Sequence, residues 1–405
     1  MTPHNATAGD LPRPSGLFDC DVLVVGGRVA GASTAMLLAR AGHKVVLVDR
    51  AQLPSDTVST HAVLRSGVLQ LSRWGVLDGV LEAGTPPVRR ITLGFGADQV
   101  GFDVKAEYGV EALVAPRREV LDAVLLEAAV EAGVNAYDRT RLTRLLRNEG
   151  GSVIGAVVER DGKEVSIRAR FVVGADGTNS RVRGLVGARP YHQYSATNAV
   201  HYAYFSGLDI PGFWFQFSPG VNAGTIRTNA GLACVFVGRP VSQLGAFRND
   251  ADREFFRLLR SGSAELAERV SSGSRETPFR GTTGLAGFVS TPWGPGWVLV
   301  GDAGHTKDPI SAHGISDALR DAELAARAID RSLENPAETV YAMDSFHRDR
   351  DLLALRIYRE SQALAAYEWD AAEASARMRV ISDEVRAECA FLQELPSWGP
   401  AYSAA

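Results

Sequence analysis

The sequence has 405 residues, of which 45% are hydrophobic and 22% charged, and its formal net charge is −4. This is the composition of an ordinary globular protein long enough for two packed domains, and the weak negative charge argues against a nucleic-acid-binding surface. No apolar run is long enough for a membrane-spanning helix, and three widely spaced cysteines favour a reducing compartment, so we expect a cytoplasmic protein.

The first third of the chain opens with a leader and a strand–helix–strand pattern. Residues 1–19 contain no basic stretch followed by an apolar one, so we predict a disordered leader and no secretory signal. Residues 22–25 form an apolar run typical of a buried parallel strand. After a glycine turn, apolar residues recur at helical spacing, Gly42 closes the helix, and residues 45–48 predict a second strand.

The turn after residues 22–25 has the features of a dinucleotide-binding site. Gly26 makes the tight turn, Gly31 lets helix and strand pack closely, and the helix N-terminus offers N–H groups to a pyrophosphate. Asp49 ends the second strand, where an acid accepts the adenosine ribose hydroxyls. Arg28 stands where the motif has its second glycine, so its side chain must point outward or bind a phosphate oxygen itself.

The next segments alternate between strand and helix patterns. After a loop at residues 51–65, residues 66–83 predict one helix, and the runs 90–95 and 99–104 predict a hairpin inserted from a second domain. Helical spacing returns between about residue 118 and Gly133. Strand-like runs follow at residues 141–146, 152–159, 165–170 and 171–173.

The middle third, residues 191–280, is rich in aromatic and turn residues and predicts an antiparallel sheet. Its strands are expected at residues 199–206, 212–218, 224–228 and 233–237, and one helix is expected at residues 250–270. A buried strand at residues 296–300 then leads through a loop into a long helix. Residues 337–395 are helical and charged, which suits a cap on the sheet or a dimer contact.

Three separated motifs share one feature, because each follows a short buried strand with glycine and an acid. They begin at Gly26, at residues 173–177 (VGADG) and at residues 300–302 (VGD). Their order and spacing resemble the flavoprotein monooxygenases of the para-hydroxybenzoate hydroxylase type, together with the related geranylgeranyl reductases and flavin-dependent halogenases. The resemblance covers the chain to about residue 335.

The resemblance implies an α/β fold with a Rossmann-type FAD-binding domain, an inserted antiparallel β-sheet substrate domain and a helical C-terminal tail. The FAD-binding domain would comprise residues 20–85, 113–187 and 284–336. The substrate-binding domain would comprise residues 86–112 and 188–283, and the helical region residues 337–405.

The resemblance also implies which residues hold FAD. Around the ADP half they are Gly26, Gly27, Arg28, Gly31, Asp49 and Arg50. Arg118, with Arg117 as the adjacent candidate, would reach the phosphate or ribityl region. Asp176 and Gly177, followed by Ser180 and Arg183, match the motif near the pyrophosphate, while Gly301 and Asp302 match the motif whose acid accepts a ribityl hydroxyl.

The loop before the long helix matches the family only in part. Pro309 and Gly314 agree with the family pattern P-x-x-G-x-G-x-N, whereas Ala312 and Ser316 replace its usual glycine and asparagine. The helix N-terminus at His313, Gly314 and Ile315 could supply N–H groups to the N1–C2=O edge of the flavin, where reduction places negative charge.

The reaction implied by the resemblance is monooxygenation, hydroxylating or epoxidising a small aromatic or polycyclic metabolite. Because no second GxGxxG unit follows, NADPH or NADH would bind only transiently, and the reduced flavin would react with O2 to a C4a-hydroperoxide. Candidate catalytic residues are His61, His313 and Pro309, with His305 ranked behind them. Candidate substrate contacts, or ordinary core residues, are Tyr202, Tyr204, Trp214 and Gln216. No metal site is expected.

Three alternatives stay open. A reductase of the geranylgeranyl type shares the same motifs and a similar length. A halogenase is disfavoured, because residues 214–219 read W-F-Q-F-S-P where tryptophan halogenases have W-x-W-x-I-P, and Lys105 is the only lysine between residues 45 and 162. A flavin-binding protein without catalytic activity is the third.

Overall fold

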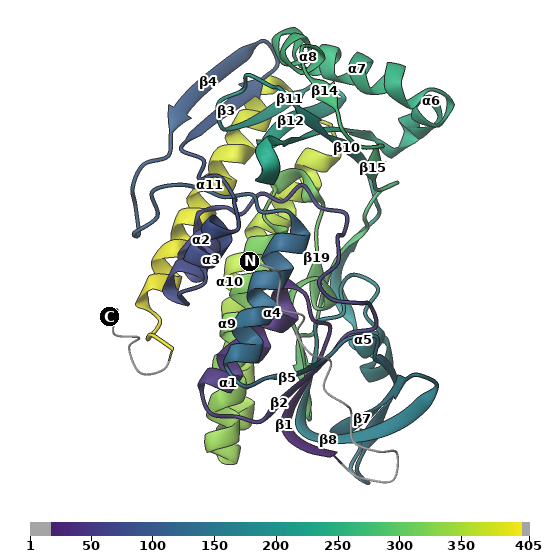
Figure 1. Ribbon diagram of the computed structural model, residues 1–405, viewed down its shortest axis with the longest axis vertical. Coiled ribbons are helices and arrows are strands. Elements are labelled where there is room, and N and C mark those ends of the chain that lie inside the picture. Colours follow the sequence, from purple (N-terminus) through teal and green to yellow (C-terminus); the bar gives the residue numbers. More distant parts are fainter. Residues whose placement is uncertain (1–17, 399–405) are drawn as a thin grey trace.

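The computed structural model describes residues 18–398. The leader predicted for residues 1–19 lies outside this range, except that residues 18 and 19 already belong to β1 (Phe18–Val25). The predicted α/β architecture is confirmed: two large sheets lie at opposite ends of the molecule, with long helices running between them (Figure 1). Within the described range, no helix combines the length and the apolar character needed to cross a membrane.

The first sheet brings the three sequence motifs together. β1 pairs in parallel with β2 (Val45–Val48) and with β8 (Lys163–Gly174), and β8 pairs in parallel with β18 (Trp297–Leu299). The motifs follow β1, β8 and β18. Because parallel strands end at the same edge of a sheet, the motifs meet there. The remaining strands are β5 (Asn135–Tyr137), β6 (Arg141–Arg147), β7 (Val153–Arg160) and β17 (Trp293–Gly294).

Helices cover one face of this sheet. α1 (Val29–Arg40) packs against α4 (Arg118–Glu131) and α9 (Gly314–Glu334), and their buried apolar residues belong to one core. On the other face, the twisted β6–β7–β8 ribbon and α5 (Arg181–Val186) bury a second core. The predicted strands at 165–170 and 171–173 are one continuous strand, β8, which reaches from this ribbon into the parallel sheet.

The second sheet is antiparallel apart from one pair. Its order is β14 (Ser274–Arg275), β10 (Asn198–Ser206), β13 (Ala233–Pro240), β12 (Val221–Arg227), β11 (Phe213–Ser218), β3 (Arg90–Phe95) and β4 (Asp98–Asp103), with β15 (Arg280–Gly281) also on β10. The predicted β3–β4 hairpin is confirmed, and β3 joins the sheet by pairing in parallel with β11.

Two predicted helices are each broken in the structure. The helix expected at residues 66–83 is α2 (Arg65–Arg73) and α3 (Leu77–Glu82), because Gly75 adopts φ +67° and ends α2. The helix expected at residues 250–270 is α7 (Ala251–Gly262) and α8 (Ala264–Ser271), because Ser263 is extended and caps α8. α6 (Leu244–Asn249) precedes them, and all three cover the outer face of the second sheet.

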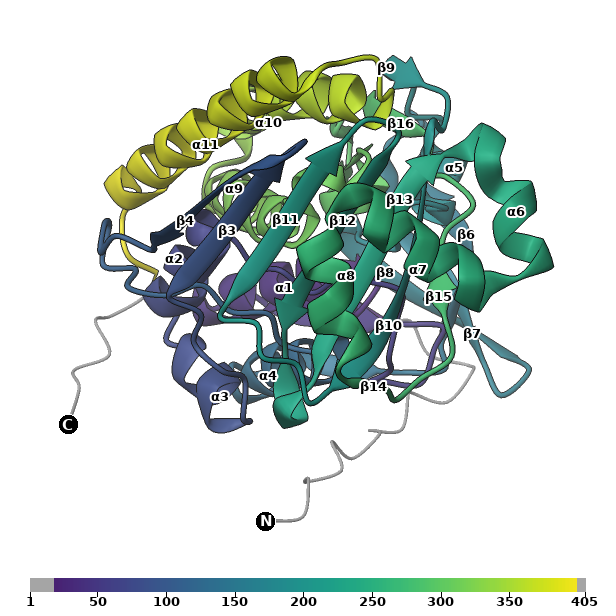
Figure 2. The same cartoon turned by 90° about the horizontal axis from the view of Figure 1, so that it is seen from above.

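The C-terminal region forms two long helices, as its pattern predicts. α10 (Thr339–Ala365) packs on α9, and α11 (Ala371–Glu394) contacts α10, α2 and β3. Figure 2 shows α10 and α11 side by side along the β3–β4 edge of the second sheet. A small sheet of β9 (Pro190–Tyr194), β16 (Gly287–Ser290) and β19 (His305–Thr306) joins the two halves.

Candidate active site

A cavity of about 900 Å³ lies where the parallel strands end. Residues of all three motifs line it, namely Gly26, Arg28, Asp49, Arg50, Asp176, Gly177 and Asp302. Its opposite wall is formed by loop residues 57–62, by Val200 and Tyr202 on β10, and by residues 281, 282 and 285. The cavity therefore lies between the two sheets, where the sequence predicts the cofactor and the substrate to meet.

The first glycine turn is shaped for close approach of a ligand. Gly26 adopts φ +107°, and a Cβ placed on Gly31 would overlap the Gly26 carbonyl. α1 begins without a side-chain cap and without an acid in its first turn, while Val29 and Ala30 line the cavity. The first N–H groups of α1 are thus available to an anion, which fits the pyrophosphate of a dinucleotide.

Asp49 and Arg28 flank this turn. Asp49 Oδ2 accepts a hydrogen bond from the Gly27 N–H at 2.7 Å, so the carboxylate is oriented by the turn itself, yet it keeps lone pairs for ribose hydroxyls. Arg28 donates to Thr57 Oγ1 at 3.0 Å and to Ser55 Oγ at 3.2 Å. Its side chain thus points outward to the loop after β2 while still lining the cavity.

The side chains of the two neighbouring arginines at the start of α4 point to different places. Arg118 lines the cavity and is held by a bidentate ion pair with Asp122, at 3.0 and 3.1 Å from Nη2. Arg117 is not among the lining residues: its guanidinium lies 4.7 Å from the ring centre of Tyr204 and pairs with Asp56. The geometry therefore favours Arg118 as the cavity-facing cation.

The Asp176 carboxylate forms its hydrogen bonds mainly with residues at the start of α5. It accepts from the Ser180 hydroxyl at 2.5 Å and from the Arg181 N–H at 2.6 Å, so it binds the first turn of α5, whose N-cap is Ser180. Arg183 stacks on Phe288, 3.9 Å from the ring centre. Gly177 adopts φ +79° beside the cavity. At this motif the backbone at Gly177 shapes the cavity wall, and the Asp176 carboxylate stabilises α5.

The loop from β18 to α9 forms the floor of the cavity. The Gly301 N–H donates to Asp321 Oδ2 at 3.2 Å, and Asp302 is exposed to the cavity. Pro309, Gly314 and Ile315 also line it. Ala312 adopts the left-handed conformation, with φ +53°, at the position where the family pattern has glycine. The chain therefore keeps a glycine-type backbone there with a strained alanine.

His313 points away from the cavity. It is fully buried, and its Nε2 is hydrogen-bonded at 2.9 Å to Glu388 Oε2 on α11. His313 is not among the residues lining the cavity, although its neighbours Ala312 and Gly314 are. The structure thus does not bring the His313 side chain to the reacting space, because Glu388, 75 positions later in the chain, holds it on the opposite side of the loop.

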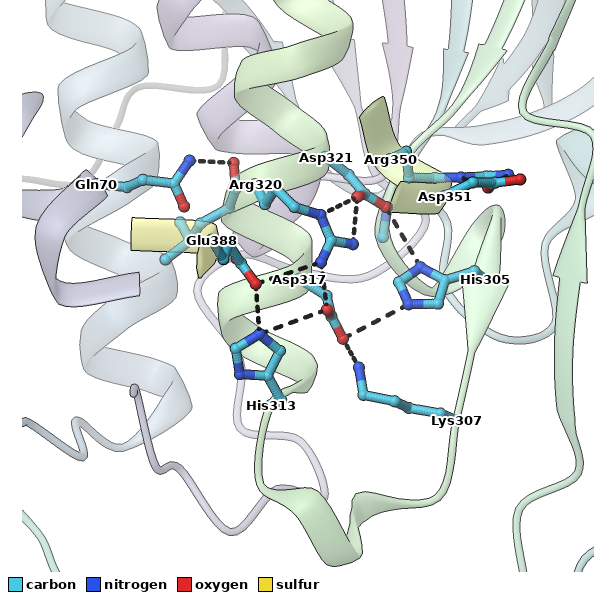
Figure 3. A network of polar contacts seen from close by, with 12 residues as sticks. Gln70, His305, Lys307, His313, Asp317, Arg320, Asp321, Arg350, Asp351 and Glu388 are labelled. Carbon is cyan, nitrogen blue, oxygen red and sulfur yellow. Dashed lines mark hydrogen bonds and ion pairs between the residues drawn. The ribbon is translucent and has the colours of Figure 1, made fainter. Parts of the chain in front are cut away.

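A network of buried charges lies beneath this loop (Figure 3). Arg320 on α9 donates to Asp317 at 2.7 Å and to Asp321 at 2.7 Å, and Glu388 approaches it at 3.7 Å. Lys307 forms an ion pair with Asp317. His305 lies 3.5 Å from Asp321, and burial lowers its pKa to about 4, so it is neutral at physiological pH.

His61 lines the cavity from the other side. It is 1% exposed, adopts φ +70° and is hydrogen-bonded through Nε2 to the Tyr204 hydroxyl. Its Nδ1 has no hydrogen-bond partner among the described residues. Burial, followed by the nearby Arg118, lowers the pKa of His61 to about 3, so the ring is neutral. Tyr202 lines the cavity. Tyr204 does not line it, and its ring packs edge-on against the ring of Tyr202.

Trp214 and Gln216 lie on the opposite face of the second sheet. Trp214 packs in the core beneath α7, and Gln216 donates to the Gly96 carbonyl at 2.9 Å and to Ser218. Neither residue is among those lining the cavity. Adjacent residues of β11 point to opposite faces, and α7 covers the face that these two share, so they serve as core residues.

Lys307 and Asp308 are cavity residues that the sequence motifs did not anticipate. Both line the cavity although both are buried. Asp308 accepts from Asn198 Nδ2 at 2.9 Å, its Oδ2 has no hydrogen-bond partner among the described residues, and burial raises its pKa to about 7. One feature of the sequence could have drawn attention to Lys307 as a site residue, namely that the chain has only four lysines.

The family model described as FAD binding domain matches residues 19–361. The chain belongs to this FAD-binding family. It is therefore a flavin-dependent oxidoreductase, and the uncapped α1 N-terminus, the glycine cradle and Asp49 fit the ADP half of FAD. The predicted resemblance to this flavoprotein group is confirmed.

Relatives in this family carry out different reactions. Over 76% of its length the chain is 29% identical to a menaquinone reductase of Mycolicibacterium smegmatis, covering 75% of that protein. It is 28% identical to a digeranylgeranylglycerophospholipid reductase of Methanosarcina mazei, with 76% of the chain and 74% of the relative covered. It is also 28% identical to a 6-methylpretetramide 4-monooxygenase of Streptomyces rimosus, with 75% and 74% covered.

Solved structures of other proteins share this fold. PqsL of Pseudomonas aeruginosa, in complex with 2-aminobenzoylacetate, has a TM-score of 0.76 at 23% identity, covering 90% of this chain and 100% of that one. The flavin-dependent brominase Bmp2, as a triple mutant, has a TM-score of 0.77 at 19% identity, covering 91% and 95%. At these identities the likeness establishes the fold.

Proposed function

We propose that the protein is an FAD-dependent monooxygenase, reduced by transiently bound NADPH or NADH, that uses O2 to hydroxylate or epoxidise a small aromatic or polycyclic metabolite. The observation that carries this proposal is the size and lining of the cavity. Its volume of about 900 Å³ must hold FAD as well as substrate, whereas ligand pockets in general span roughly 300–1,000 Å³. The space left beside FAD suits a compact molecule better than a long isoprenoid chain.

The side chains facing that space are mixed in polarity. Tyr202, Val200 and Leu285 offer apolar surface, while His61 Nδ1 and Thr282 offer hydrogen-bonding groups. A flat ring carrying an oxygen substituent matches such a wall, because apolar faces bury the ring and the polar atoms orient it. His61 would then position the substrate through Nδ1, since its low pKa makes it a poor base.

When bound, FAD supplies the electron transfer and the activation of O2. The protein's residues would hold and shield it. Arg118 and the first turn of α1 bind phosphate oxygens, Asp49 accepts ribose hydroxyls, and Asp302 accepts a ribityl hydroxyl. The N-terminus of α9 stabilises negative charge at the end of the cavity where Gly314 and Ile315 lie. The second sheet excludes water from the reacting space.

A second candidate function is reduction of an isoprenoid double bond. It is supported by the menaquinone and digeranylgeranylglycerophospholipid reductases among the relatives, which are as similar to this chain as the monooxygenase is. It would use the same FAD site without O2.

The deciding experiment mixes NADPH-reduced holoenzyme with oxygenated buffer while the flavin spectrum is recorded. We expect a short-lived spectrum distinct from those of oxidised and reduced flavin, and incorporation of oxygen-18 from labelled O2 into a phenolic polycyclic probe such as emodin. Direct return to oxidised flavin with every phenolic probe, together with anaerobic reoxidation by geranylgeraniol, would instead establish the reductase.

A further inference from the structure

We propose that Arg28 is a positioning residue that couples the cofactor phosphates to the loop beside the substrate space, so that binding of FAD closes this loop. The loop, named the cavity loop, comprises residues 55–62, and its residues 57–62 line the cavity. The inference rests on the proposed binding of the FAD phosphates at the start of α1. It is independent of the reaction, because the monooxygenase and the reductase would use the same FAD site.

Arg28 stands where the helix that faces the phosphates begins. It is the N-cap residue of α1, and it occupies the position of the second glycine in the dinucleotide-binding motif. It lines the cavity together with Val29 and Ala30, which belong to the first turn of α1. Because Arg28 is partly exposed, a ligand that enters the cavity can reach it.

The positive charge of Arg28 has no counter-charge among the described residues. No carboxylate of that range lies within 4.0 Å of it, and its hydrogen-bond partners are the hydroxyls of Ser55 and Thr57. Asp56, the acid between them, pairs with two other arginines. The N-terminus of α1 adds partial positive charge, and its first turn contains no acid. A diphosphate would neutralise both positive groups.

The guanidinium of Arg28 can hold the loop and an anion at the same time. Its Nη1 donates to Thr57 Oγ1 at 3.0 Å, and its Nη2 donates to Ser55 Oγ at 3.2 Å. A guanidinium carries further N–H donors in the same rigid plane, and in Arg28 these make no hydrogen bond to the described residues. A phosphate oxygen bound by them would fix the plane, and with it the contacts to the loop.

The rest of the cavity loop is attached to the second sheet. Asp56 forms an ion pair with Arg280 on β15, and the Ser59 N–H donates to the Tyr202 hydroxyl on β10 at 3.3 Å. Val58, between these two attachments, lines the cavity and is 50% exposed. The loop therefore connects the glycine turn with the wall formed by the second sheet.

His61 shows why the cavity loop has to be held from outside. Its backbone adopts φ +70°, a conformation that persists in residues other than glycine only when the surroundings impose it. A ligand shifts the equilibrium of such a loop only if it interacts better with one form. The phosphate does so by holding the guanidinium where it meets Ser55 and Thr57. The loop thus takes its place beside the substrate space once the cofactor is bound.

The first test follows the cavity loop by hydrogen–deuterium exchange of the full-length apoprotein, with FAD and with ADP. ADP is the decisive probe, because it carries the diphosphate but no flavin. With either ligand at saturation, we expect residues 55–62 to exchange about tenfold more slowly, the effect of one charge-assisted hydrogen bond, whereas adenosine should leave exchange unchanged. Equal exchange with and without bound ADP would overturn the proposal, because Arg28 would then hold the loop unaided.

The second test uses variants that separate the coupling from binding itself. Ser55→Ala combined with Thr57→Val keeps Arg28, so we expect ADP affinity within about twofold of wild type, but no slowing of loop exchange. Arg28→Gly restores the motif glycine, and we expect it to bind ADP and FAD about tenfold more weakly. Arg253→Ala, which removes an exposed arginine from α7, is the control for net charge and should do neither.

Two results would overturn the coupling: wild-type ADP affinity in Arg28→Gly, or ADP-dependent protection of the loop that survives the loss of both hydroxyls. Failure of the wild type to bind FAD would instead reject the proposed FAD site, and the proposed function with it. Binding of FAD without any change in loop exchange would reject the coupling alone.

Discussion

At Gly31 the lack of a side chain is a requirement of the cofactor site. A Cβ at this position would overlap the Gly26 carbonyl, and so would push α1 away from the turn that we propose holds the phosphate of FAD. We predict that Gly31→Ala folds but binds FAD at least tenfold more weakly, measured by flavin fluorescence titration of the apoprotein. Gly184→Ala in α5, where a Cβ meets nothing within 4 Å, should bind FAD normally. Equal affinity of the two variants would contradict this reading of the turn.

Asp308 makes the stability of the protein depend on pH. Burial raises its pKa to about 7, so folding favours the protonated form, and the associated stability is lost as the pH rises from about 4 through 7. Asp308→Asn cannot ionise and keeps an oxygen for the Asn198 hydrogen bond. Relative to wild type, we expect its unfolding free energy to increase by roughly 2 kcal/mol between pH 5 and pH 8.

Urea unfolding at the two pH values measures this difference. Asp209→Asn is the matched control, because Asp209 is exposed and its replacement removes a charge of the same sign. A parallel shift for both variants would mean that net charge, and not burial of Asp308, produces the effect.

At the scale of elements, α11 is coupled to the active-site loop by one buried carboxylate. Glu388 accepts from His313 at 2.9 Å and lies 3.7 Å from Arg320, and none of the three side chains is exposed. Although burial alone would raise it, His313 and Arg320 hold the pKa of Glu388 below its usual range. α11 lies beyond the end of the family match at residue 361.

We predict that Glu388→Gln lowers the unfolding free energy by about 1.5–3 kcal/mol, because it removes the charged acceptor of the buried His313 hydrogen bond and one of the carboxylates around Arg320. Thermal unfolding of the holoenzyme is the measurement. Asp383→Asn on the same helix removes an exposed partner of Arg386 and should cost less than about 0.5 kcal/mol. Similar losses in the two variants would argue against a special role for the buried contact.

At the scale of the whole molecule, the cavity proposed to bind FAD is assembled from distant parts of the chain. Its motifs follow β1, β8 and β18, and the opposite wall comes from the second sheet. The residues that line the cavity run from Val25 to Ala318. FAD should therefore stabilise both sheets together, by about 2.7 kcal/mol when its concentration is 100 times the Kd.

Calorimetry of apoprotein and holoenzyme tests this coupling. We expect removal of FAD to lower the Tm, with both sheets unfolding in one transition in the holoenzyme. Addition of FAD to Gly31→Ala should raise its Tm much less. An FAD-independent Tm, or a holoenzyme in which the second sheet melts separately, would contradict the coupling.

The sequence by itself determined the strand–turn–helix units and their order. Local patterns suffice there, because the buried runs at β1 and β8, the helical spacing of α1 and the glycines at the turns act over a few residues. Parallel strands then place their carboxyl ends together, so the convergence of Gly26, Asp49 and Asp302 on one cavity also followed from the sequence. The broken helices α2–α3 and α7–α8 were missed because one residue in each, Gly75 or Ser263, outweighed an otherwise continuous apolar stripe.

Only the tertiary structure decided which side chains reach the cavity. Alternation along a strand defines two faces but does not say which is covered, so the packing of α7 placed Trp214 and Gln216 in the core, while Tyr202 faces the site. His313 was turned away from the cavity by Glu388, and the Lys307 ammonium was drawn into the buried network by Asp317. Such contacts join residues far apart in sequence, and their outcome depends on burial and charge balance, which exist only once the chain has folded.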